Sequence, residues 1–177
     1  LTCLLSIAII ELSVGAIQFK QQFIGIYALK GSPICFVDGS TATIFLSDEI
    51  GDFSKATITS HLSSIGVKKK QFVDVMQFES NEKIRLERME GVDLFFAFNK
   101  TLLIVKDSKL VNNLKLKQEN INVLLDENIT LKSITSLDTT VSAVFAFDFP
   151  SWKTPKSRKL SSEQIHFLSR DGYYELK

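Results

Sequence analysis

The sequence predicts an α+β fold, in which a mainly antiparallel sheet of about six to eight strands has two or three helices packed on one face. Three observations lead to this prediction. Short apolar runs separated by turn residues dominate the chain from Gln18 onward, as is typical of strands joined by hairpins. Helical starts or periodicity occur near residues 52–66, 108–114 and 161–169. Strand runs rarely alternate with long helical ones, which disfavours a doubly wound parallel sheet.

Residues 1–16 have the features of a secretory signal peptide without its basic start. An apolar run covers residues 1–10, and Val14 and Ala16 provide small side chains at the positions that signal peptidase reads. The run is shorter than the roughly 20 residues that a membrane span needs. We expect cleavage after Ala16, a single globular domain at residues 17–177, no remaining membrane span, and a periplasmic or secreted location. The alternative is that this segment is a buried strand or helix.

Composition and charge limit the classes of protein that fit the chain. Hydrophobic residues make up 45% and charged residues 23%, which indicates a globular chain rather than a disordered one. The formal net charge of +1 gives no general attraction to nucleic acid or to anionic membranes. Cys3 would leave with the signal peptide, so Cys35 would remain without an intramolecular disulfide partner. The fold would then depend on packing alone.

The first elements of the mature chain are predicted to be a hairpin, a strand and a helix. The hairpin joins residues 23–29 to 34–37 across a turn of Lys, Gly, Ser and Pro, and residues 42–46 follow as a strand. Asp52 is placed to cap a helix that buries every third or fourth residue, and Gly66 is placed to end it.

The middle of the chain shows a clearer strand pattern. Residues 71–78 and 83–88 are predicted strands, the second alternating between apolar and charged side chains as a strand with one wet face does. Residues 92–98 and 102–105 are so apolar that we place this hairpin at the centre of the sheet. Ser108 then begins a second predicted helix.

The last third is predicted to contain more strands, followed by a C-terminal segment that fits either a helix or a hairpin. The expected strands are residues 120–125, 129–134 and 141–149. Ser161 and Gln164 have the spacing of a capping box, which predicts a short helix to about Ser169. A hairpin that turns at residues 170–172 is the alternative.

No catalytic or metal-binding motif stands out. Cys35 and His61 could act as nucleophile and base, but no glycine-rich elbow or helix start lies beside Cys35 to lower the pKa of its thiol. The alternative is an inert core cysteine and a surface histidine. Two histidines and one cysteine lack the short ligand spacing of a zinc site. No phosphate-binding glycine motif occurs, so the sequence predicts neither metal nor cofactor.

The best surface candidate is the loop at residues 150–159. It combines two prolines and the only Trp with four basic residues and no acid. Such a loop could bind an acidic protein, a phospholipid headgroup or a polyanion, or it could be a solvated connector. The candidate binding residues are Trp152, Lys153, Lys156, Arg158 and Lys159.

Three functions from different classes follow from these features. The leading hypothesis is a secreted or periplasmic non-enzymatic domain that binds a macromolecular partner, such as another protein, or contributes to an envelope or extracellular assembly. The second is a carrier of a small apolar ligand in a cavity lined by some of the 14 Phe residues. The third is a cysteine hydrolase that uses Cys35 with His61.

Overall fold

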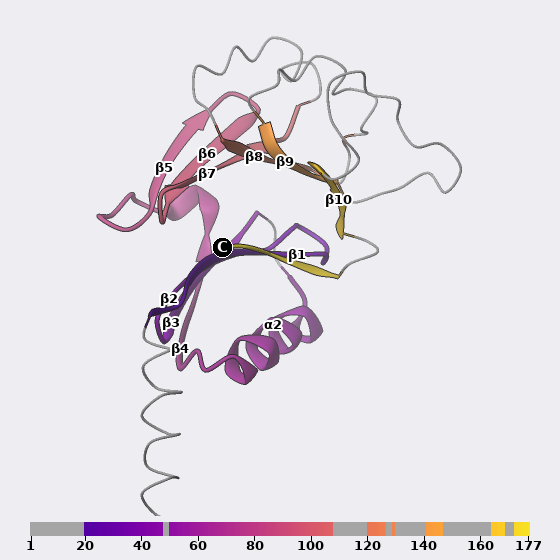
Figure 1. Ribbon diagram of the computed structural model, residues 1–177. Helices are drawn as coiled ribbons and strands as arrows, with labels where there is room; N and C mark the ends of the chain where they lie inside the picture. Colours follow the sequence, from indigo (N-terminus) through magenta and orange to yellow (C-terminus); the bar gives the residue numbers. More distant parts are fainter. Residues whose placement is uncertain are drawn as a thin grey trace, which may run out of the picture.

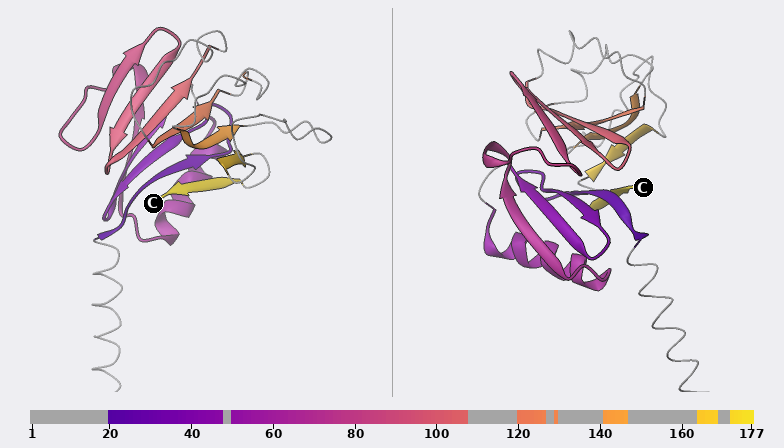
Figure 2. Two further views of the ribbon diagram at one scale, coloured as in Figure 1. Left: turned by 45° about the horizontal axis from the view of Figure 1, so that its top comes forward. Right: turned by 90° about the vertical axis from the view of Figure 1, so that its left-hand side faces the viewer.

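Two mixed β-sheets face each other, and helix α2 (Asp52–Ser64) covers the outer face of one of them (Figure 1). The structure is a computed structural model that describes residues 20–47, 50–107, 120–126, 129, 141–146, 164–168 and 172–177. Figure 2 shows the same layers from two further directions. Among the described residues, no helix has the length and apolarity needed to cross a bilayer.

The five-stranded sheet has the order β11-β1-β2-β3-β4. Its strands are β1 (Gln22–Tyr27), β2 (Ile34–Asp38), β3 (Thr41–Leu46), β4 (Lys69–Asp74) and β11 (Tyr173–Leu176). The pairs β11–β1, β1–β2 and β2–β3 are antiparallel, whereas β4 runs parallel to β3. A parallel neighbour requires a crossover connection, and α2 provides it. This crossover places β4 at one edge of the sheet.

The six-stranded sheet has the order β10-β9-β8-β7-β6-β5. Its strands are β5 (Arg85–Met89), β6 (Val92–Ala97), β7 (Lys100–Val105), β8 (Ile121–Leu125), β9 (Val141–Ala146) and β10 (Ile165–Phe167). β5, β6 and β7 pair antiparallel, and β7 to β10 pair parallel. The chain passes from the first sheet to the second after β4, through the 3₁₀ helix η1 (Val75–Gln77).

The predicted fold class is wrong. The described residues form two mixed sheets rather than one mainly antiparallel sheet, and α2 is the one α-helix with defined bounds rather than one of two or three on a single face. Four strand pairs are parallel. The direction of a strand leaves no mark on its own pattern of apolar residues, so the sequence could not distinguish hairpins from crossovers. All five residues of β8 are buried, as expected of a parallel strand covered on both faces.

Several local predictions are confirmed. The hairpins β1–β2 and β6–β7 form, and β6 and β7 lie inside their sheet. Helix α2 begins at Asp52, although Gly51 is the N-cap residue and no side chain caps it. Gly66 adopts a positive φ of 88° at its end, the conformation in which glycine commonly terminates a helix. The predicted strand at 71–78 instead spans Lys69–Asp74 and gives way to η1.

Both predictions for the C-terminal segment are wrong. Residues 165–167 form β10 rather than a helix, and β10 and β11 belong to different sheets rather than to one hairpin. Gly172, with a φ of 71°, donates its N–H to the carbonyl of Leu168 at 2.8 Å where the chain changes sheet. Residues 1–16, the predicted helix from Ser108 and the predicted strand residues 130–134 lie outside the described residues.

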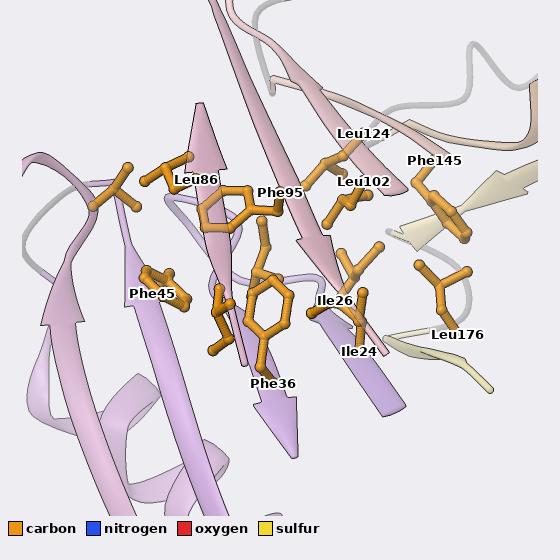
Figure 3. Packing of buried hydrophobic residues seen from close by; sticks show 14 of the residues in the cluster. Ile24, Ile26, Phe36, Phe45, Leu86, Phe95, Leu102, Leu124, Phe145 and Leu176 are labelled. Carbon is orange, nitrogen blue, oxygen red and sulfur yellow. The ribbon is translucent and has the colours of Figure 1, made fainter. Parts of the chain in front are cut away.

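Aromatic side chains fill the space between the sheets. Phe36 and Phe45 of the five-stranded sheet contact Phe95 of the six-stranded sheet, with ring centroids 5.3 and 5.0 Å apart (Figure 3). All three rings are at most 2% exposed. The tilted and edge-on orientations are those that aromatic quadrupoles prefer. Ile24, Ile26 and other apolar residues of both sheets extend this shared core.

The opposite face of the five-stranded sheet packs against α2. The alternation of side chains sends Cys35 and Val37 of β2 toward the helix, while Phe36 points into the shared core. Ile58 and Leu62 of α2 complete this second cluster, and neither is exposed. The cluster therefore holds Cys35 of the predicted catalytic pair, while His61 belongs to the helix that covers it.

Replacing Phe95 tests the importance of the shared core. We expect Phe95→Ala to lower the free energy of unfolding by about 3–5 kcal/mol, because it removes a fully buried ring and leaves a cavity. Urea unfolding followed by circular dichroism measures the change. Phe53→Ala is the control, since Phe53 is 82% exposed and should change stability by no more than about 0.5 kcal/mol. Equal losses in both variants would contradict the assignment of the core.

Candidate functional site

The predicted nucleophile Cys35 is enclosed beneath α2. Its side chain is 0% exposed, and burial raises the pKa of its thiol to about 12. A Cβ built on Gly25 of the neighbouring strand would lie 2.6 Å from Cys35 Sγ and 2.7 Å from Tyr173 Oη. The space above the sulfur is therefore occupied by protein. At neutral pH the group is a protonated thiol rather than the thiolate that nucleophilic attack needs.

The predicted base His61 lies on α2 at the border of this cluster, with Tyr27 as its hydrogen-bond partner. Tyr27 Oη is 2.9 Å from His61 Nδ1, and the ring of Tyr173 packs against the His61 ring with centroids 4.4 Å apart. Burial, with the neighbouring Cys35 as the second cause, raises the pKa of the Tyr27 hydroxyl. The structure therefore places Tyr27 next to both Cys35 and His61, and Nδ1 of the imidazole bonds to this tyrosine.

A small cavity lies between the two sheets, with a mainly apolar lining that includes one buried carboxylate. Asp93 of β6 is only 4% exposed, and the ammonium of Lys106 lies 2.5 Å from its Oδ2. No group among the described residues donates to that oxygen with good hydrogen-bond geometry. The cavity that Asp93 and Lys106 line, together with Phe45 and Ser47, has a volume of about 30 Å³. This is room for water rather than for a substrate or an apolar ligand.

The other predicted sites gain no description from the structure. The candidate binding residues Trp152, Lys153, Lys156, Arg158 and Lys159 all lie outside the described residues. Within the described part of the chain, no group of three His, Cys, Asp or Glu side chains is arranged to hold a metal ion.

The outer edge of β4 is the candidate binding site that the structure adds. Lys69 donates its N–H to the carbonyl of Ser40, on the β3 side, at 3.0 Å. Because successive residues of a strand direct their backbone groups to opposite sides, the backbone groups of Lys70, Phe72 and Asp74 point away from β3. No strand within the described residues pairs with this side of β4. The edge therefore offers the backbone N–H and C=O groups of three residues to a further strand.

The other three sheet edges are shorter or protected. β10 has three residues and β11 has four, against six in β4. On β5, the Ser80 hydroxyl accepts a hydrogen bond from the N–H of Leu86 at 2.9 Å and donates one to its carbonyl at 3.2 Å. Charged side chains flank that position in β5, a common protection against pairing. Among the described strands, β4 has the longest unpaired edge, although Lys69, Lys70 and Asp74 place charges on it as well.

Comparison with known proteins adds no family. No protein-family model matches the chain, and searches of the curated proteins and of the solved structures found no match. The proposals below therefore rest on the geometry of this chain.

Two features of the site were missed by the sequence analysis, and neither had a usable signal. Tyr27 and Tyr173 are far apart in the sequence, yet their rings pack 4.7 Å apart. The predicted strand begins at residue 71, whereas β4 already includes Lys69 and Lys70. Only the sheet order shows that this strand lies at an edge.

Alkylation tests the enclosure of Cys35. We expect iodoacetamide to leave Cys35 unmodified in the folded protein between pH 7 and pH 9, because its raised pKa of about 12 keeps the thiol protonated and the site is closed. In guanidinium chloride the pKa should return to about 8.5 and the reaction should go to completion. Peptide mass spectrometry reads the modification at Cys35. Similar rates in the folded and unfolded protein would show that the thiol is accessible.

Proposed function

We propose that this chain is an extracytoplasmic, non-enzymatic domain that binds a protein partner by adding an extended segment of that partner to the edge of β4. The observation that carries the proposal is the row of outward backbone groups at Lys70, Phe72 and Asp74, which have no strand partner among the described residues. Strand addition of this kind gains affinity from backbone hydrogen bonds and specificity from the side chains beside them.

The side chains of β4 define the chemistry of the added segment. Phe72 and Val73 are both half-buried. Phe72 packs against the cluster between the sheet and α2, and Val73 packs against the shared core. A strand added beside β4 would cover the exposed parts of both side chains. Lysines on an edge strand oppose pairing with an arbitrary strand, so the partner should carry an acidic residue opposite Lys70.

The alternatives have less support from the described residues. A cysteine hydrolase needs a reachable thiolate, and Cys35 is enclosed and protonated. The cavity of about 30 Å³ that Phe45 lines is too small for an apolar ligand. The larger open hollow of about 630 Å³ beside Phe96 and Phe98 is lined mainly by polar and charged side chains, which do not suit such a ligand. The extracytoplasmic location rests on the signal-like pattern of residues 1–16.

Lys70→Pro tests the proposal. Proline removes the outward N–H of Lys70 without breaking a bond to β3, so the variant should fold and lose capture of the partner. Lys70→Ala is the control for the lost side chain, because it keeps the N–H. To test the location, the native product is isolated from the exported fraction and its first residue is determined. To test the binding, the proteins that co-purify with the wild type and with both variants are quantified.

The expected result is a product that begins at Ile17 and a co-purifying protein retained by Lys70→Ala but reduced at least about tenfold by Lys70→Pro. Circular dichroism of both variants checks that they remain folded. Equal capture by the two variants would refute strand addition at β4. A product found in the cytosol with residues 1–16 intact would refute the location.

A further inference from the structure

Two copies of β4 are complementary to each other when they run antiparallel. In an antiparallel pair, residues directly opposite each other either both direct their backbone groups into the pair or both direct them away. Within β4, the outward residues Lys70, Phe72 and Asp74 can therefore pair only with other outward residues. If the two-fold axis passes through Phe72, each Lys70 lies opposite Asp74 of the second copy. We infer that the partner at the β4 edge is a second copy of this chain, paired in this register.

The charges of β4 select this register over its neighbours. With the axis at Lys70, two lysines would face each other, and like charges directly opposite are destabilising. With the axis at Gln71, Lys70 would face the Phe72 ring. Asp74 would then face Lys68, which precedes β4 and already donates its N–H to the carbonyl of Ser40 at 2.8 Å. Of these three registers, only the one with its axis at Phe72 places Lys70 opposite Asp74. The two-fold symmetry forms this pair twice. This register also creates about six backbone hydrogen bonds, two for each outward pair.

The side chains on the α2 face of β4 fit the same arrangement. Lys70, Phe72 and Asp74 alternate with Lys69, Gln71 and Val73, so the first three share one face of the sheet. The half-buried Phe72 rings of the two copies would meet at the axis, and aromatic pairs across strands are favourable. The two five-stranded sheets would then join into one continuous sheet with a helix beside each Phe72. This inference rests on the proposed function, because it names the segment that is added to β4.

Charge reversal tests the register. In Lys70→Glu, both copies place Glu opposite Asp74, and in Asp74→Lys both place Lys opposite Lys70, so each variant alone should dimerise at least about tenfold more weakly than the wild type. An equimolar mixture of the two variants restores both opposite-charge pairs and should recover the wild-type dimer as a heterodimer. Sedimentation velocity over a concentration series measures each association.

Lys69→Glu is the matched control. It makes the same change in net charge on the same strand, but its side chain lies on the other face, so its dimer should be weakened much less than that of Lys70→Glu. Asp74 also accepts a hydrogen bond from the N–H of Met76 at 2.7 Å, so thermal unfolding checks that Asp74→Lys remains folded. The mixture guards against a misfolded variant, because only two folded chains can form the heterodimer.

A wild-type chain that stays monomeric at all concentrations, or a mixture no better than its components, would overturn the inference. These outcomes differ from a failure of the proposed function. A monomeric chain whose partner capture is lost in Lys70→Pro would keep strand addition at β4 and exclude only the second copy. A dimer disrupted by Lys70→Glu and restored by the mixture supports both.

Discussion

The contact of Phe36 and Phe45 with Phe95 joins the two sheets, and the rest of the arrangement depends on it. Each sheet is apolar on its inner face and needs the other to remove that face from water. Once the sheets are stacked, their outer faces and edges must be covered separately. Helix α2 covers the outer face of the five-stranded sheet through Ile58 and Leu62. As a crossover connection, α2 also leaves β4 last in the sheet, and no described strand pairs with its outer side.

The candidate catalytic residues lie on or beneath α2, whereas the backbone of β4 lies at a sheet edge. Cys35 and Tyr27 lie beneath α2, where burial keeps the thiol protonated, and His61 of α2 bonds to Tyr27. Their contacts stabilise the packing of α2 on the sheet and do not form a reactive pair. The β4 edge instead has backbone groups that no described strand pairs with, and the proposed binding would use these groups. Binding through such an edge needs no motif, which fits a chain whose sequence offers none.

Part of the fold was predictable from the sequence because part of it is local. Turn residues between apolar runs gave the β1–β2 and β6–β7 hairpins, and the spacing of Ile58 and Leu62 with Gly66 after them gave α2. Parallel pairing was not predictable, because it depends on connections rather than on the paired residues. The site was less predictable still. Cys35 and His61 were found as residue types, but the enclosure by Tyr27 and Tyr173 and the edge position of β4 arise only from tertiary packing.

Residue-resolved hydrogen exchange of β4 tests the central claim most directly. In dilute solution, the amides of Gln71 and Val73, which point toward β3, should exchange slowly, while those of Lys70, Phe72 and Asp74 should exchange rapidly. Such a pattern with a period of two is expected of an edge strand bonded on one side only. Slow exchange at all of these positions in dilute solution would mean that another part of the chain covers the edge, and the account of β4 as a binding site would be wrong.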